Sequence, residues 1–169
     1  LVMKKNLFVV VFAVVGMLLT CACSNEELGA VESKADVKVT FKLGLENAMN
    51  TRAISDGSLI NKLHFAIFDS TGAIVESSKD RGAEFPFTTS VSLVKGEQYT
   101  AVFWAQNKDC TAYTISEDMT TIEVDYAGAL NNDEARDAFF RSETFVVDGD
   151  VDLDVVLKRA LAQRNVGVS

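Results

Sequence analysis

The stretch from Val37 to Leu45 alternates strictly between apolar residues and polar or small ones, and this alternation constrains the fold more than any other feature of the chain. The apolar residues stand at every second position: Val37, Val39, Phe41, Leu43 and Leu45. Because successive side chains of a β-strand point to opposite faces, a period of two places all five on one face. The stretch therefore predicts a strand with one face in a core and the other in solvent.

Further strands are predicted along the rest of the chain, at intervals of about 8–12 residues with turn signals between them. They cover residues 59–69, 73–76, 87–93, 98–107, 111–115, 120–125, 143–147 and 151–157. The segment 98–107 is apolar on both faces, which predicts a central position in a sheet. Asp148-Gly149 favours a two-residue hairpin between the last two strands. Together these segments predict an all-β fold, a mostly antiparallel β-sandwich.

One short helix is predicted within this sandwich, over residues 132–140. Asp133 and Glu134 are suited to a helix N-terminus, because carboxylates accept hydrogen bonds from the free amide groups there. We expect Phe139 and Phe140, at the other end of the segment, to dock on the sheets.

The first 22 residues have the composition of a secretory signal peptide. Lys4 and Lys5 precede an apolar run over residues 7–19. This run is shorter than the roughly 20 residues that a transmembrane helix needs. A basic start, a short apolar run and small residues after it are typical of a cleaved secretion signal.

The residues after the apolar run resemble the lipobox of bacterial lipoproteins, in which a small residue precedes the cysteine that is acylated. Cys21 and Cys23 both lie in this segment, and Cys23 fits better because the small Ala22 precedes it. We expect residues 23–35 to form a lipidated tether. Its acidic start resembles the signals that send lipoproteins of Bacteroides-type bacteria to the outer face of the outer membrane, so we expect a lipid anchor and exposure on the cell surface.

Charge and cysteine content limit the partners and the means of stabilisation. Without residues 1–22 the chain carries 14 basic and 24 acidic residues, a side-chain charge of −10. A surface so acidic repels phosphate backbones, which argues against a nucleic-acid partner. With Cys23 acylated, Cys110 has no second cysteine for a disulfide, so the core must supply the stability.

The residues that could carry chemistry do not form a recognisable catalytic or metal site. His64 is the single histidine, and no serine nucleophile motif accompanies it, so we expect a structural or surface role. Aspartates stand at positions 148, 150, 152 and 154, but the glycine and terminal glutamate of a calcium-binding EF-hand loop are missing. Their period of two instead matches the solvent face of a strand. We therefore expect no enzyme, no metal and no cofactor.

Several segments resemble the N-terminal domain of the fimbrillin-like lipoproteins of Bacteroides-type bacteria, a family of type V pilin-like proteins. They are TRA at 51–53, DGS at 56–58, LHFAIFD at 63–69, YTAVFWAQN at 99–107, RDAFF at 136–140 and VLKRALAQRNVG at 156–167. The resemblance covers residues 23–169 and departs from the family at Ala160, Leu161 and Arg164. It implies a transthyretin-like β-sandwich over residues 36–169. Because relatives continue past the position of Ser169, it also implies a C-terminal domain that this sequence does not include.

The resemblance implies a fimbrial structural, anchor or tip-adhesin subunit and a mode of assembly. A trypsin-like protease would cut between Arg52 and Ala53, in a polar loop where proteolysis is easiest. The strand over residues 37–45 would then leave, and a strand from another fimbrial subunit would fill its groove.

The alternative is a surface glycan-binding lipoprotein of a polysaccharide-utilisation system, which binds host or bacterial glycans. Its platform would consist of exposed aromatic residues such as Trp104 or Tyr113. Since Trp104 falls on the predicted central strand, packing in the core is the other interpretation of that residue.

Overall fold

Nine strands and one short 3-10 helix make up the regular structure of the computed structural model, which describes residues 35–46, 56–130 and 133–160. The strands are β1 (Asp36–Leu45), β2 (Lys62–Asp69), β3 (Ile74–Gly82), β4 (Phe87–Val94), β5 (Gln98–Gln106), β6 (Tyr113–Ile115), β7 (Ile122–Val124), β8 (Ala138–Val146) and β9 (Val151–Arg159), and the helix, η1, is Glu134–Arg136. This composition confirms the predicted all-β fold. No helix in these ranges is long and apolar enough to cross a membrane.

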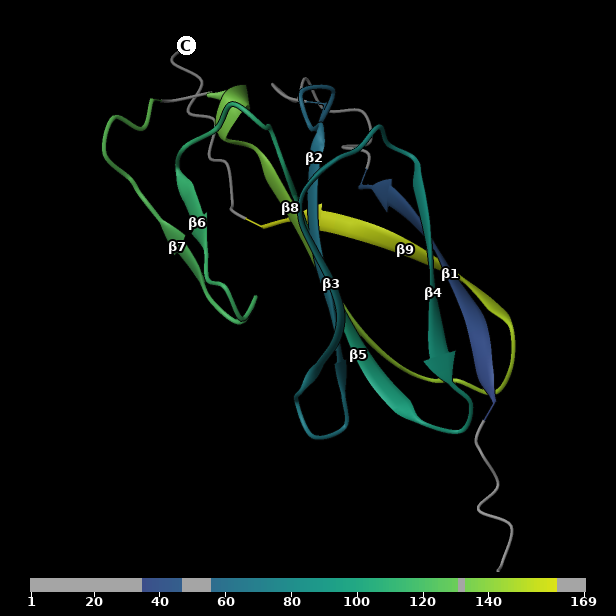
Figure 1. Cartoon of the computed structure of the whole chain (residues 1–169). Coiled ribbons are helices and arrows are strands. Elements are labelled where there is room, and N and C mark those ends of the chain that lie inside the picture. The colour runs from purple at the N-terminus through teal and green to yellow at the C-terminus, as the bar shows by residue number, and fades with distance from the viewer. Residues whose placement is uncertain (1–34, 47–55, 131–132, 161–169) are drawn as a thin grey trace, which may run out of the picture. The chain divides into compact units, whose positions relative to one another are not determined.

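Seven strands join in the order β3-β2-β5-β8-β9-β1-β4, and β6 and β7 form a separate ribbon (Figure 1). Among the pairs of described strands, β1 and β9 run parallel and the others antiparallel. Two residue pairs, Phe139 with Arg159 and Phe140 with Lys158, join β8 to β9. At this narrow junction the seven strands divide into two layers, one of β3, β2, β5 and β8 and one of β9, β1 and β4.

The main core lies between these two layers. Phe41 of β1 contacts Phe103 of β5 and Phe145 of β8, with ring centroids 5.2 and 5.6 Å apart. Since β1 is not next to β5 or β8 in the sheet order, these contacts pack one layer on the other. The largest fully buried side chains of the described residues are Phe41, Phe103, Phe139, Leu43, Leu63, Ile67, Leu157, Val39 and Val147.

A second, smaller cluster covers the outer face of β5. Trp104 packs there with Tyr113 of β6, their ring centroids 5.1 Å apart, and with Ala112 and Ala138. This cluster explains why residues 98–107 are apolar on both faces: one face of β5 belongs to the main core and the other to the cluster beside β6. The predicted central position of this strand is confirmed, because β5 pairs with β2 and β8.

The prediction of a helix up to residue 140 is wrong. Asp133 does cap a helix, since its side chain accepts a hydrogen bond from the amide of Ala135, but only the single 3-10 turn η1 follows. Residues from Ala138 onward pair with β5 along nine positions and form β8. Consequently Phe139 and Phe140 point to opposite faces: Phe139 is in the core, whereas Phe140 is 39% exposed.

The predicted two-residue hairpin at Asp148-Gly149 is also wrong. β8 ends at Val146 and β9 begins at Val151, and the described pairing between them lies at the ends farthest from this connection. β9 pairs with β1 from Val151 to Leu157 instead, which separates it from β8 near the turn. The strand expected at residues 73–76 is longer than predicted, because β3 continues to Gly82 along the edge of β2.

Candidate functional site

Strand β1 lies between β4 and β9 and is hydrogen-bonded on both sides. Its antiparallel register with β4 runs from Asp36 opposite Val94 to Leu43 opposite Phe87. Beyond the two ends of β1, Ala35 accepts a hydrogen bond from the amide of Lys95 at 3.0 Å, and the amide of Glu46 donates to the carbonyl of Leu157 at 2.8 Å. Removing β1 would therefore leave a slot with an unpaired backbone edge on each side.

The inward face of β1 completes the main core. Val39, Phe41 and Leu43 are fully buried, and Val37 and Leu45 are partly buried against the same cluster. The structure thus confirms that the five residues predicted to share one face do so. The slot between β4 and β9 is apolar along its floor, and β1 fills it.

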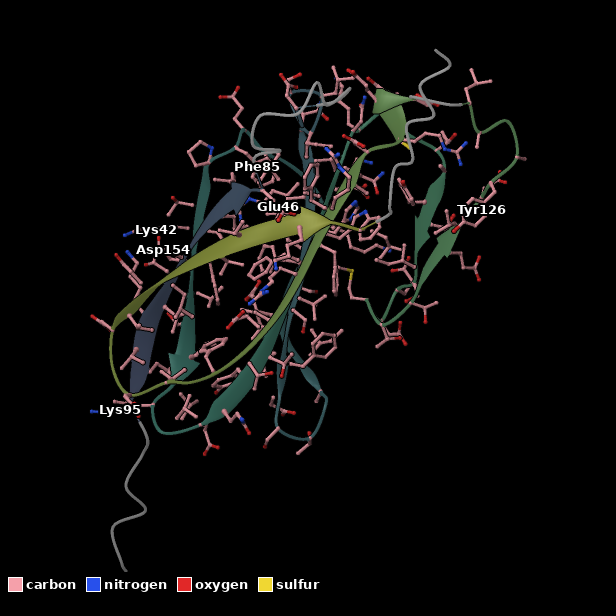
Figure 2. The ribbon with its side chains drawn as sticks, turned by 180° about the vertical axis from the view of Figure 1, so that it is seen from behind. Lys42, Glu46, Phe85, Lys95, Tyr126 and Asp154 are labelled. Atoms are coloured by element: carbon pink, nitrogen blue, oxygen red, sulfur yellow. The ribbon has the colours of Figure 1, made fainter. Side chains whose placement is uncertain are left out.

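The outward face of β1 is polar and contacts β9 and β4 through side chains. Lys42 Nζ lies 2.7 Å from Asp152 Oδ2, and Asp150 Oδ1 accepts a hydrogen bond from the amide of Lys38 at 2.8 Å. On the other side, the hydroxyls of Thr40 and Ser90 are 3.2 Å apart. Lys42 and the neighbouring Asp154 lie close together on this face (Figure 2).

The contact between Lys42 and Asp152 shifts the proton equilibria of both groups. Its hydrogen bond and the attraction between the charges raise the pKa of Lys42 and lower the pKa of Asp152. Asp154 acts on Lys42 in the same direction, and Lys38 acts likewise on Asp152. The outward faces of β1 and β9 therefore carry opposite charges that attract one another, basic on β1 and acidic on β9.

The end of β1 opens onto a hollow of about 570 Å³ whose lining includes Leu45, Gly57, Ile60 and Phe85. Gly57 has φ of 77°, and a β-carbon on it would lie 3.1 Å from Leu45 Cδ1. Close approach to β1 and this backbone angle both favour glycine there. Glu46 and Phe85 mark this end of β1 in Figure 2. The described residues stop at Glu46 and resume at Asp56, which lines the same hollow as Leu45.

The residues predicted for cleavage and lipidation lie outside the described residues. They are Arg52 and Ala53, between the described positions 46 and 56, and Cys23 near the N-terminus. Proteolysis and acylation at these residues stay predictions.

His64 is a buried side chain next to Asp80. Its Nδ1 accepts a hydrogen bond from the amide of Asp80 at 3.2 Å, and its Nε2 lies 3.9 Å from Asp80 Oδ1. Burial lowers the pKa of His64, and the negative charge of Asp80 opposes this effect. Burial thus favours the neutral imidazole, and the side chain is enclosed beside Asp80 of β3, which agrees with the predicted structural role.

The aromatic platform expected for a glycan-binding protein is absent at the residues named for it. Trp104 is 6% exposed and Tyr113 is 8% exposed. The indole Nε1 donates to Gln106 Oε1 at 2.7 Å, and the Tyr113 hydroxyl donates to the carbonyl of Arg136. These two side chains stabilise the second cluster and leave no ring face for a sugar, so the interpretation of Trp104 as a core residue is the right one.

The aspartates at 148, 150, 152 and 154 lie on or just before the solvent face of β9, as their period of two predicts. Within the described ranges, no group of three or more histidine, cysteine or acidic side chains is placed to hold a metal ion. Sequence reasoning missed that Asp150 and Asp152 contact β1. Lys38 and Lys42, four positions apart on the outward face of the predicted strand, were a signal for it, but the pairing of β9 with β1 was needed to interpret them.

The fold and this site define an all-β sandwich domain in which an apolar strand fills a slot between two other strands. The chain belongs to the DUF6562 family, a family of unknown function whose sequence profile matches residues 31–169. The comparison with curated proteins found no match.

Solved structures with a similar arrangement of strands include two from fimbrial systems. The fimbrial anchor protein Mfa2 from Porphyromonas gingivalis is 15% identical, with a TM-score of 0.48 over 74% of this chain and 51% of that one. A fimbrial assembly protein from Parabacteroides distasonis is 11% identical, with a TM-score of 0.30 over 74% and 52%.

A third similar structure is a DUF1812 protein from Bacteroides thetaiotaomicron, described as a candidate polysaccharide binding protein. It is 14% identical, with a TM-score of 0.44 over 73% of this chain and 46% of that one. The chain spans about half the length of each of these three structures.

Proposed function

We propose that this protein is a lipid-anchored subunit of a surface fimbria, with a structural, anchoring or tip-adhesin role, that accepts a strand from another subunit in the slot of β1. The observation that carries the proposal is the position of β1, an interior strand whose five inward side chains belong to the core. The resemblance to fimbrillin-like lipoproteins supplies the partners, which are other fimbrial subunits, and the location at the outer membrane.

The apolar contacts of β1 set the energy of such an exchange. Fully burying one large apolar side chain contributes about 1.5–3 kcal/mol, so Val39, Phe41 and Leu43 give on the order of 5–9 kcal/mol before ordering costs, and the partly buried Val37 and Leu45 add to this. This is as large as the whole stability of a typical domain, which is about 5–15 kcal/mol. The domain without β1 would therefore unfold or take up another strand, and a strand with the same apolar alternation restores the core.

Cleavage after Arg52 would make the exchange possible. β1 lies between Cys23 and Arg52 in the chain, so the cut would leave the domain attached to its lipid only through the contacts of β1. Replacement of β1 by a strand of a neighbouring subunit would then detach the domain from its own lipid anchor and bind it to that subunit. An uncut chain would keep β1 and act as an anchor.

Digestion with an arginine-specific protease tests the proposal. Of the arginines in the described ranges, Arg81, Arg141 and Arg159 lie in strands and Arg136 in η1, so we expect cleavage after Arg52 to precede cleavage at these four. N-terminal sequencing should then find a product that begins at Ala53. Arg52→Lys should abolish this product, and the matched variant Arg141→Lys should leave it unchanged. If no product begins at Ala53, cleavage does not occur there.

Strand replacement is measured on the cleaved protein. An excess of a labelled peptide with the sequence of residues 36–45 should displace the N-terminal fragment, as followed by native mass spectrometry. A peptide with Phe41→Asp and Leu43→Asp is the control, because charged side chains cannot enter the apolar floor of the slot. Equal retention of the two peptides would contradict replacement at this slot.

A further inference from the structure

We propose that the acidic rim of the slot selects the incoming strand by charge: the partner strand carries basic side chains at the two outward positions that Lys38 and Lys42 hold in β1. This inference rests on the proposed strand replacement and adds the chemistry of the partner. The apolar floor alone selects weakly, since any strand with apolar residues at alternate positions fits it.

The rim on the β9 side is acidic beside Thr40 and Lys42 and apolar beside Gly44, where Val156 stands. Asp152 and Asp154 stand at alternate positions on the outward side of β9, and Asp150 lies one residue before the strand. The parallel register sets Thr40 beside Asp152 and Lys42 beside Asp154. Asp150 also accepts the hydrogen bond from the amide of Lys38. A strand in this slot therefore passes three carboxylates at close range.

The rim on the β4 side carries no charge. The residues of β4 opposite the outward positions of β1 are Thr88, Ser90 and Ser92, all with hydroxyl side chains. Hydroxyl groups can hydrogen-bond to basic and to acidic side chains alike. The preference for a basic strand therefore comes from the β9 side alone. The two sides together favour a strand with basic residues at the positions of Lys38 and Lys42 and a hydroxyl or small residue at the position of Thr40 between them.

The contacts of β1 show how the selection works. Lys42 Nζ is 2.7 Å from Asp152 Oδ2 and is also attracted by Asp154, and Lys38 acts on Asp152. When β1 leaves, the carboxylates lose both lysines. Acidic side chains at the same positions would stand beside like charges on the neighbouring strand, which is destabilising. Attraction at a distance would also speed the approach of a basic strand.

Competition between peptides on the protein cleaved after Arg52 tests the inference. The reference peptide has the sequence of residues 36–45, and the test peptide carries Lys38→Glu and Lys42→Glu. We expect the test peptide to bind about tenfold more weakly at low salt, because it reverses the exposed pair of Lys42 with Asp152 and the attraction between Lys38 and Asp152. The difference should shrink in concentrated salt, because screening acts on exposed charges. A peptide with Lys38→Arg and Lys42→Arg should bind like the reference.

Variants of the protein supply the reciprocal arm. Asp152→Lys with Asp154→Lys should reverse the preference, and Asp152→Asn with Asp154→Asn should remove it. The asparagine variant keeps the shape of the rim, so it still tests the inference if the lysine variant does not fold.

The outcomes separate this inference from the proposed function. Equal binding of the reference and the acidic peptide overturns charge selection and leaves strand replacement intact. Failure of the reference peptide to exchange at all overturns strand replacement, and charge selection with it. Weaker binding of the acidic peptide that persists unchanged in the neutral variant also overturns selection by the rim.

Discussion

The ring of Phe41 in β1 meets the ring of Phe103 in β5 edge-on, with centroids 5.2 Å apart and an angle of 62° between the planes. Phe103 belongs to the layer opposite β1 and is itself fully buried. Edge-to-face packing of two aromatic rings adds to the free energy gained from their burial. This contact makes β1 a part of the core as well as a part of its sheet, so its loss affects both layers.

Phe41→Ala should lower the free energy of unfolding by about 3–5 kcal/mol, because it leaves a cavity between the two layers. Urea denaturation followed by Trp104 fluorescence measures the change. Thr40→Ala, on the outward face of the same strand, is the control and should change the free energy by about 1 kcal/mol, since it removes the contact with Ser90 but leaves no cavity between the layers. Similar losses in the two variants would contradict the role of β1 in joining the layers.

Tyr113 should ionise only in strongly alkaline solution. Burial raises its pKa to about 12 from the ordinary value of 10.0. The unfolded chain loses this proton near pH 10.0, before the folded protein does. The contribution of neutral Tyr113 to the stability of the fold is therefore complete below pH 10 and is lost as the pH rises toward 12.

A pH titration of phenolate absorbance measures this ionisation. The difference between the parent protein and Tyr113→Phe isolates the titration of the one side chain. A midpoint for this difference near pH 10 would show that Tyr113 is not buried beside Trp104.

His64 should make the protein less stable in mild acid. Burial lowers its pKa below the ordinary 6.5, and Asp80 opposes this shift. As the pH falls, the unfolded chain therefore takes up a proton at His64 before the folded protein does. The contribution of neutral His64 to the stability of the fold is complete above pH 6.5 and is lost as the pH falls through the pKa of the folded state. Asp80→Asn should lower the pKa of His64 further, because it removes the opposing charge.

The His64 resonance in NMR spectra gives the pKa directly, since the chain has one histidine. Asparagine also suits position 80, where φ is 56°. Unfolding measured against pH, compared with His64→Gln, gives the linked change in stability. A midpoint at or above 6.5 in the parent protein would contradict the effect of burial.

The strands that sequence reasoning located are those whose pattern is complete within a few residues. The alternation from Val37 to Leu45 fixes both the strand and its inward face, and the structure confirms it. The first residues of β8, Ala138 to Phe140, were assigned wrongly to a helix, because Asp133 and Glu134 carry a local helix signal that ends after one turn. Pairing with β5, a strand distant in sequence, decides the structure from Ala138 onward.

The site shows the same division between local and distant information. The inward residues of β1 were predicted, whereas the partners of its outward residues were not. Asp152 is 110 positions from Lys42, and their contact depends on β9 leaving β8 to pair with β1. Likewise, no local pattern decided whether Trp104 would face solvent, because Tyr113 and the ribbon of β6 and β7 bury it.

The sequence by itself determined that the protein is all-β and that Val37–Leu45 is a strand with a single apolar face, since both depend on the alternation of neighbouring side chains. Only the tertiary structure decided that this strand lies inside a sheet, parallel to β9 and antiparallel to β4, with an acidic rim along one side. The physical reason is that strand order arises from hydrogen bonds and packing between segments far apart in the chain, and no short stretch of sequence encodes them.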